Sequence, residues 1–318
     1  MRTSSKLMES SEILVTGGAG FIGFHFVMRL LKDPDWSDFQ VRVIDSLTYA
    51  ANPDHIRELR SWDRVTLEQV DISDFKLLSG AFGNPKYVVN FAAETHVDNS
   101  LKVPLRFVKT NVLGTSNLLE LSRDRNVERF LQVSTDEVYG SIAEGIAAET
   151  APLNPSSPYS ASKAAADLLV QGFAKSFDLD YVITRCSNNF GPGQHDEKLI
   201  PTMLRCLKNS QPVPIYGDGE YRREWIDVRD HVEGILMCLT RGRSGEIYNL
   251  GSGIVLSNLE LLTLAVESSM EETQVRFVDD RAAHDRRYAL DSSKARLELG
   301  FEAKRTLDDY FGLEVRRA

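Results

Sequence analysis

The feature that most constrains the fold is a glycine-rich turn between an apolar strand and a helix near the N-terminus. Residues 12–16 form a short apolar run that leads directly into Gly17, Gly20 and Gly23. At this spacing the first glycine permits a tight turn, the second a close approach of the backbone to a pyrophosphate, and the third close packing of the next helix on the sheet. The helix expected near 20–32 then directs its N-terminal amides at the phosphates. The segment therefore predicts a dinucleotide-binding unit.

A second strand ends at an acidic residue that indicates which dinucleotide is bound. Residues 40–44 are typical of a strand, and Asp45 follows it, 22 positions beyond Gly23. A carboxylate at this place accepts hydrogen bonds from the adenosine ribose and repels a 2′-phosphate. We therefore expect NAD rather than NADP. The alternative is a glycine-rich loop and a surface aspartate in an unrelated α/β protein.

Strand-like and helix-like segments alternate through the first half of the chain. Strands are expected at 12–16, 40–44, 65–70, 87–91, 129–133 and 181–184, and helices near 20–32, 74–82, 104–124 and 159–177. Such alternation predicts right-handed βαβ crossovers and therefore an α/β fold with a doubly wound, Rossmann-type parallel sheet. Ligands of these sheets bind at the carboxyl ends of the strands, so we expect the functional residues there.

The character of the sequence changes near residue 186. Turn-rich segments follow at 188–193, 211–214 and 216–219, with shorter elements between them. We expect three parts, with elements that can cross the second boundary: a flexible N-terminal extension at 1–11, an NAD-binding domain at 12–185 and a smaller α/β substrate-binding lobe at 186–318. A chain of 318 residues, of which 42% are hydrophobic, is long enough for such a core.

Composition excludes several classes of partner. The net charge of -9 argues against binding to nucleic acid or to an anionic membrane surface. No apolar run approaches the roughly 18 residues of a membrane span. Cys186, Cys206 and Cys238 are widely spaced and match neither a zinc site nor a disulfide framework. We therefore expect no metal, reduced thiols and a cytoplasmic location.

Two groups of residues predict the chemistry. Tyr159 and Lys163 lie four residues apart on an expected helix, so they share one face. An ammonium beside a phenol favours the phenolate, which lets the tyrosine act as a base near neutral pH. Thr135, Asp136 and Glu137 follow an expected strand, and two adjacent carboxyl groups disfavour double ionisation. The combination predicts a redox site that also eliminates a group, whereas the alternative for the acidic pair is a solvated turn.

With these motifs the chain resembles the extended short-chain dehydrogenase/reductase family and, within it, the dTDP-glucose 4,6-dehydratases. The resemblance runs from about residue 12 to about residue 303. It is carried by residues 16–23, 45–49, 91–98, 134–140, 157–163, 184–189, 197–201, 216–219 and 284–288. The glycine turn and the Tyr–Lys pair are common to many sugar-nucleotide enzymes, whereas the Thr-Asp-Glu triple is more specific to the dehydratases.

The resemblance implies an internal redox elimination on dTDP-glucose that gives dTDP-4-keto-6-deoxyglucose and water through tightly bound NAD. In that reaction Tyr159, assisted by Lys163, takes the proton of the C4 hydroxyl while hydride leaves C4. Glu137 removes the C5 proton, Asp136 protonates the departing C6 hydroxyl, and Thr135 hydrogen-bonds the C4 oxygen. Two alternatives are a 4-epimerase or decarboxylase acting on another nucleotide sugar, such as a UDP-hexose, and a non-catalytic NAD-binding protein on the same fold.

The resemblance also implies binding residues. Those for the cofactor are Gly17, Gly20, Phe21, Ile22, Gly23, Asp45, Ser46, Leu47, Thr48, Asp71, Ile72, Phe91, Ala92, Ala93, Glu94, Thr110, Tyr159, Lys163 and Asn189. Those for the nucleotide sugar are Thr95, Thr135, Asn188, Lys198, Leu199, Pro214, Ile215, Tyr216, Arg223, Asn258, Arg281 and His284. The two arginines suit a diphosphate, because a guanidinium can bind it with two hydrogen bonds. A homodimer is implied as well, through a four-helix bundle of the helices near 104–124 and 159–177.

Overall fold

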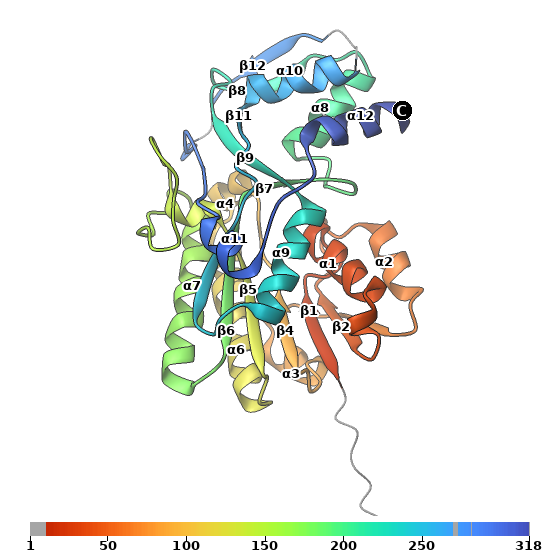
Figure 1. The fold of residues 1–318 in the computed structure, drawn as a ribbon, viewed down its shortest axis with the longest axis vertical. Helices are drawn as coiled ribbons and strands as arrows, with labels where there is room; N and C mark the ends of the chain where they lie inside the picture. The colour runs from red at the N-terminus through yellow and green to blue at the C-terminus, as the bar shows by residue number, and fades with distance from the viewer. Residues whose placement is uncertain (1–10, 270–272, 281, 318) are drawn as a thin grey trace, which may run out of the picture.

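The computed structural model describes residues 11–269, 273–280 and 282–317, so the predicted N-terminal extension lies outside the described residues except for Ser11. The larger part is a parallel seven-stranded sheet with the order β10-β6-β5-β4-β1-β2-β3 (Figure 1). Its strands are β1 (Glu12–Thr16), β2 (Gln40–Asp45), β3 (Val65–Gln69), β4 (Tyr87–Asn90), β5 (Arg129–Thr135), β6 (Tyr181–Cys186) and β10 (Glu246–Leu250). The predicted doubly wound fold is confirmed.

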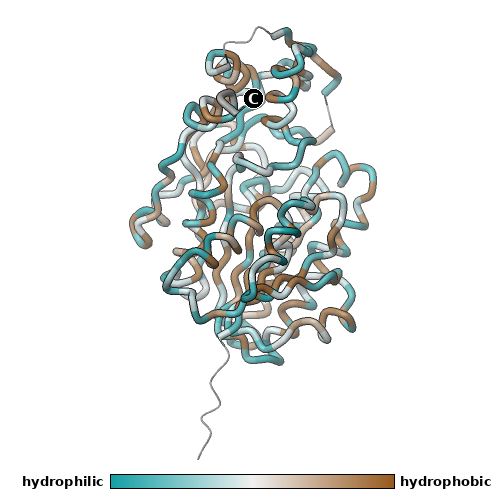
Figure 2. Tube along the Cα trace, turned by 90° about the vertical axis from the view of Figure 1, so that its right-hand side faces the viewer, coloured by the Kyte–Doolittle hydropathy of each residue, from teal (hydrophilic) through white to brown (hydrophobic). Residues whose placement is uncertain are grey.

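Helices cover both faces of this sheet. One face packs against α1 (Phe21–Lys32), α9 (Val228–Arg241) and α11 (Ser293–Leu299), and the other against α3 (Phe75–Ala81), α6 (Thr115–Asp124) and α7 (Pro158–Phe177). The short η1 (Pro34–Trp36) and α2 (Pro53–Arg60) flank β2 in the chain. Figure 2 shows hydrophobic segments running through the middle of this part. Strands β5 and β6 are buried almost throughout, which explains their continuous apolar sequence.

The predicted helix over 104–124 is not one regular helix. After α4 (Val97–Lys102), the chain forms α5 (Pro104–Phe107), a π-helical stretch η2 (Val108–Gly114) and then α6. Asn111 lies in that stretch and is buried. Its amide donates to Ser162 Oγ at 2.8 Å and to the Glu94 carbonyl at 3.0 Å, and its oxygen accepts the Glu94 N–H at 2.8 Å. The irregular turn thus joins the segment after β4 to α7, and such π-helical turns are frequent at functional sites.

A smaller lobe stands above the carboxyl ends of the strands (Figure 1). It contains a three-stranded sheet of β7 (Asn188–Phe190), β9 (Arg222–Asp227) and β11 (Val255–Ser257), and a two-stranded sheet of β8 (Val213–Tyr216) and β12 (Val275–Val278). The helices α8 (Leu199–Lys208), α10 (Asn258–Ser269) and α12 (Leu307–Arg317) complete it. Strand β10 and helices α9 and α11 come after residue 185 but belong to the larger part. Within the described residues, no helix is long and apolar enough to cross a bilayer.

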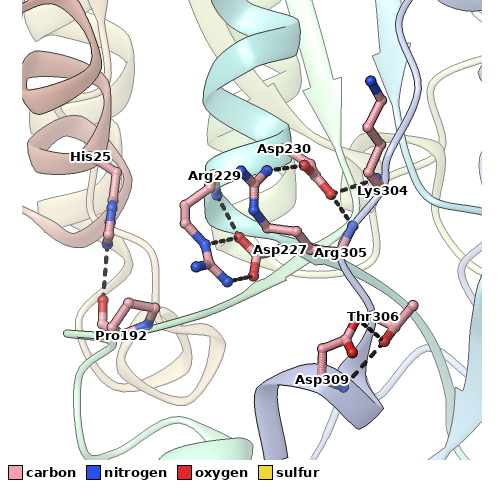
Figure 3. Close-up of polar contacts among 9 residues, drawn as sticks. All are labelled: His25, Pro192, Asp227, Arg229, Asp230, Lys304, Arg305, Thr306 and Asp309. Carbon is pink, nitrogen blue, oxygen red and sulfur yellow. Dashed lines mark hydrogen bonds and ion pairs between the residues drawn. The ribbon is translucent and has the colours of Figure 1, made fainter. Parts of the chain in front are cut away.

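Two buried aspartates lie at the start of α9, and the second of them ties the segment before α12 to this helix (Figure 3). Asp227, which is fully buried, caps α9 by accepting the Arg229 N–H at 2.8 Å, and it also binds the Arg229 guanidinium. Asp230 accepts the N–H groups of residues 304–305, both at 2.7 Å. Because α9 packs on the large sheet, the Asp230 contacts fix the segment before α12 relative to that sheet.

Candidate active site

One cavity of about 530 Å³ at the carboxyl edge of the sheet collects most of the predicted residues. From the predicted cofactor set it is lined by Gly17, Gly20, Phe21, Ile22, Gly23, Asp45, Ser46, Thr48, Asp71, Ile72, Phe91, Ala92, Ala93, Glu94, Thr110, Tyr159, Lys163 and Asn189. Thr135, Asp136 and Glu137, which are predicted to be catalytic, line the same cavity. The residues predicted for the dinucleotide and those predicted for acid–base chemistry therefore share one space.

The glycine turn at one end of the cavity has the geometry that its sequence requires. Gly17 has a φ of +68°, and a Cβ there would lie 2.7 Å from the Ala92 nitrogen. A Cβ at Gly23 would overlap the Gly17 carbonyl oxygen. Helix α1 begins at Phe21 without a side-chain cap, so its first N–H groups remain for an anion. The turn fits a pyrophosphate.

Asp45 is held in place by the backbone on both sides. Its Oδ2 accepts the Ala19 N–H at 3.0 Å, and its Oδ1 accepts the Leu47 N–H at 2.8 Å. Leu47 has a φ of +50°, which is uncommon for a leucine. The Leu47 side chain packs against the core and does not line the cavity, unlike the other predicted cofactor residues.

The start of α7 places the Tyr–Lys pair. The Ser157 hydroxyl accepts the Ser160 N–H at 3.1 Å, and the Ser160 hydroxyl accepts the Ser157 N–H at 3.0 Å. This capping box, with proline in the first turn, fixes where the helix begins. Tyr159 consequently lies in the first turn and Lys163 one turn later, both buried. The Lys163 ammonium donates to the Val133 carbonyl at 2.7 Å.

The pKa of Tyr159 depends on its burial as well as on its charged neighbours. Burial, followed by the charge of Glu137, raises the pKa of Tyr159 well above its usual value, and a hydrogen bond with Thr135 only partly opposes this. Burial also lowers the pKa of Lys163. In the site without ligand, desolvation therefore opposes the phenolate that the lysine neighbour is expected to favour. A further positive charge in the cavity would favour it.

The two acids follow directly from the end of β5. The Thr135 hydroxyl accepts the Glu137 N–H at 3.3 Å and donates to Asp136 Oδ1 at 3.1 Å, which shapes the short turn η3 (Asp136–Tyr139). Asp136 is 3% exposed, and its Oδ2 is buried without a hydrogen-bond partner. Burial and the charge of Glu137 raise its pKa well above the usual value. Burial therefore favours the protonated form of Asp136, which is the form that a proton donor needs.

The predicted substrate residues divide into two groups. The cavity is lined by Thr95, Thr135, Asn188, Lys198 and Leu199. Pro214, Ile215, Tyr216, Arg223, Asn258 and His284 lie in the lobe and do not line it. Ile215 is 1% exposed in the lobe core, so its side chain is not available to a ligand. Arg281 lies outside the described residues.

Arg223 and His284 of the lobe, both predicted to bind the substrate, have contacts that indicate what each does. The Arg223 guanidinium lies 4.5 Å from the centroid of the Tyr288 ring, and its charge lowers the pKa of Asp136. Arg223 is therefore near the acids although it does not line the cavity. His284 stacks on Tyr221 with ring centroids 3.6 Å apart, which indicates a structural role.

Two cations that line the cavity were missed from the sequence. Arg106 and Lys109 both line it, and Arg106 Nε lies 2.7 Å from Glu94 Oε1. They are three residues apart on one predicted helix, and a net acidic chain needs local positive charge to bind a diphosphate. Two cations on one predicted helix, in a chain that needs local positive charge, could therefore have identified Arg106 and Lys109 from the sequence. Trp225 of β9, also missed, brings the lobe to the cavity wall.

Comparison with known proteins agrees with this geometry. The family model described as GDP-mannose 4,6 dehydratase matches residues 14–312. The chain belongs to this family. A dTDP-glucose 4,6-dehydratase from Streptomyces griseus is 48% identical over 293 residues, which are 92% of this chain and 89% of that protein. The low-salt glycan biosynthesis protein Agl12 from Haloferax volcanii is 46% identical over 96% of both chains.

A solved structure of the dehydratase family is similar throughout. It is DesIV, a dTDP-glucose 4,6-dehydratase from Streptomyces venezuelae whose structure holds NAD, with a TM-score of 0.91 and 44% identity over 96% of each chain. The resemblance to dTDP-glucose 4,6-dehydratases inferred from the sequence motifs is thus confirmed over nearly the whole chain.

Proposed function

We propose that this member of the dehydratase family converts dTDP-glucose to dTDP-4-keto-6-deoxyglucose and water. The observation that carries the proposal is a buried Asp136, whose pKa is raised by burial and by the adjacent Glu137, in the same cavity as Tyr159 and the glycine turn. The uncapped start of α1 and the fixed carboxylate of Asp45 suit NAD. When bound, NAD supplies a cationic hydride acceptor that later returns the hydride to the sugar.

Each catalytic side chain then moves one proton. Tyr159 takes the proton of the C4 hydroxyl, and positive charge in the cavity lowers its pKa for this step. Once C4 is a carbonyl, the C5 proton becomes acidic and Glu137 removes it. Asp136 gives its proton to the C6 hydroxyl, which leaves as water. As hydride returns to C6, Glu137 gives its proton back to C5, and the proton that Tyr159 took from the C4 hydroxyl passes through solvent to Asp136, which restores the starting state.

The alternative reactions do not need this pair of acids. A 4-epimerase or a decarboxylase acting on a UDP-hexose requires the tyrosine and the hydride acceptor but no proton transfer at C5 and C6. A buried carboxyl with one oxygen unpartnered lowers stability, so its presence beside Glu137 favours elimination. A non-catalytic NAD-binding protein would have no use for the buried Tyr159 either.

The proposed function is tested by product analysis. We expect purified protein to convert dTDP-glucose to a product that is lighter by one water and absorbs in base as a 4-keto sugar. UDP-glucose should react more slowly, although thymine and uracil differ by one methyl group, worth only about 1–3 kcal/mol. Unchanged dTDP-glucose, or a hexose inverted at C4, contradicts the proposal.

We also propose that the protein is a cytoplasmic homodimer. Large apolar side chains are exposed along the segment from α4 to η2 and on α7, namely Leu101, Val103, Leu105, Val108, Leu113 and Leu168. A second copy that places the same helices against them would bury this face in a four-helix bundle. Cys186, Cys206 and Cys238 are unpaired and buried, which is consistent with a reducing compartment.

A charge in the exposed apolar face should separate the dimer. We expect Leu105→Asp combined with Leu168→Asp to sediment as a monomer at micromolar concentration, because these side chains are 75% and 57% exposed in one chain. Leu297→Asp is the matched control, since Leu297 is 84% exposed on α11 and lies outside this face. Wild-type protein that sediments as a monomer would refute the dimer.

A further inference from the structure

A buried ion pair lies behind the Tyr–Lys pair, outside the cavity. Asp167 follows Lys163 by one turn of α7 and is fully buried. Arg185 on β6 is 1% exposed, and its Nε lies 3.0 Å from Asp167 Oδ2. Neither Asp167 nor Arg185 lines the cavity, so neither contacts a ligand there. Three ionisable side chains of alternating charge thus follow one another: Lys163 and Asp167 on α7, and Arg185 on β6.

The ion pair is held by further buried groups. Arg185 Nη1 donates to the Tyr139 hydroxyl at 2.9 Å, and the guanidinium carbon lies 4.9 Å from the centroid of that ring. The Tyr139 hydroxyl donates to Asn249 Oδ1 at 2.9 Å, and Asn249 is fully buried in β10. Tyr139 closes the turn that carries Asp136 and Glu137. The network therefore joins the catalytic turn, α7 and two strands of the sheet.

Such an arrangement needs a reason, because a buried ion pair contributes less to stability than apolar groups of the same volume. Lys163 is 4% exposed, and a buried ammonium loses its proton unless an anion lies close to it. Asp167 is the carboxylate one turn further along α7. In the described part of the chain no ion pair joins it to the Lys163 ammonium, which donates to the Val133 carbonyl, so Asp167 acts on Lys163 through its charge alone. Arg185 in turn favours the ionised form of Asp167 and fixes its orientation.

We propose that Asp167, oriented by Arg185, is a positioning residue that keeps Lys163 protonated and therefore able to favour the Tyr159 phenolate. This inference rests on the proposed function, because the phenolate is the base of that reaction. Asp167 acts only through Lys163 and touches neither sugar nor cofactor.

The charges around Lys163 agree in direction with this role. Burial lowers its pKa, whereas Asp167 and Cys186 raise it. Burial raises the pKa of Asp167, whereas Arg185 and Lys163 lower it. The titratable groups whose charges act on this cluster are Cys186 on β6 and Tyr139 on the turn after β5. Tyr159 and Asp136 interact in turn with Cys186 and with Glu137.

The test is the pH profile of Asp167→Asn, which keeps an oxygen for Arg185 but removes the negative charge. We expect kcat at pH 7 to fall about 10–100-fold and the acid limb of the kcat profile to move up by about one pH unit or more. The reason is that a neutral Lys163 no longer favours the phenolate. KM should change little. If Lys163 instead kept its charge in the variant, loss of the Asp167 carboxylate would lower the pKa of Tyr159. The acid limb of the kcat profile would then move to lower pH, and that result would overturn the proposal.

Further variants keep the test decisive. In a Lys163→Met background, Asp167→Asn should give no additional shift, because both changes act through the same ammonium. Should Asp167→Asn fail to fold, Asp167→Leu with Arg185→Met removes the pair without an orphaned charge and should move the limb in the same direction. Asp180→Asn is the control, since Asp180 pairs with Arg129 at 2.6 Å at the opposite end of the strands.

The outcomes separate the two proposals. Wild-type protein that forms no 4-keto product rejects the proposed function. Wild-type protein that forms the product, together with an Asp167→Asn variant whose acid limb is unmoved, rejects the positioning role alone. A lower melting temperature with an unmoved limb also rejects it, because a purely structural residue behaves in that way.

Discussion

Tyr159→Phe is expected to lower kcat for dTDP-glucose by about 10³-fold, because no other phenol lines the cavity within the described residues to take the C4 hydroxyl proton. The ring itself should remain in place. Tyr159 is 7% exposed and lies edge-to-face with Phe107, with ring centroids 6.2 Å apart. The melting temperature and the affinity for NAD should therefore stay close to those of the wild type. Steady-state kinetics, thermal unfolding and NAD titration measure the three quantities.

The control for this variant is Tyr181→Phe. Tyr181 is also buried, but it lies at the first position of β6, far from the carboxyl edge of the sheet. Loss of its hydroxyl should leave kcat nearly unchanged. A Tyr159→Phe protein that keeps most of its activity would show that another group takes the C4 proton, and the assigned role would then be wrong.

Glu137→Gln is expected to stop the reaction after its first half. Oxidation at C4 requires Tyr159 but not Glu137, whereas removal of the C5 proton requires a carboxylate there. We therefore expect kcat for the 4-keto-6-deoxy product to fall by about 10²–10⁴-fold while reduced nicotinamide accumulates on the protein. Absorbance of the reduced cofactor, followed with product analysis by mass, separates the two halves.

A matched control for Glu137→Gln is Glu128→Gln, an exposed glutamate just before β5. It should show wild-type kinetics. An epimerase or a decarboxylase would tolerate Glu137→Gln, since neither needs a base at C5. Full turnover of the sugar nucleotide by this variant without loss of water would therefore favour those alternatives over elimination.

The parts of the site that were predictable from sequence depend on local spacing. The distances from Gly17 to Gly23 and from Tyr159 to Lys163 each lie within one turn or one helix, so backbone geometry fixes them. Asp45 was predictable because the strand that precedes it must end at the edge where β1 also ends. These cases need no knowledge of how distant segments meet.

What could not be predicted depends on contacts between distant segments or on desolvation. The return of β10 to pair with β6 sets the edge of the sheet, yet residues 246–250 carry no signal of their partner. The high pKa of Tyr159 arises from burial beneath several elements, whereas the sequence showed only its lysine neighbour. The pairing of Asp167 with Arg185 likewise depends on α7 packing over β6.

The substrate lobe was the least predictable part for the same reason. Ile215 and Arg223 belong to short strands of different small sheets, and their positions depend on how those sheets pack. Motif resemblance placed both at the ligand, but Ile215 fills the lobe core and Arg223 adjoins Asp136 from outside the cavity. Short elements joined by turns leave side-chain direction undetermined by local pattern.

The most direct measurement follows a deuterium label at C4 of dTDP-glucose through a turnover without added NAD. If one cavity holds the phenol, the proton donor, the proton acceptor and the hydride carrier, the label must leave C4 and appear at C6 of the same product molecule. The product should also be lighter by one water. Label retained at C4, or returned to an inverted C4, would contradict the central claim.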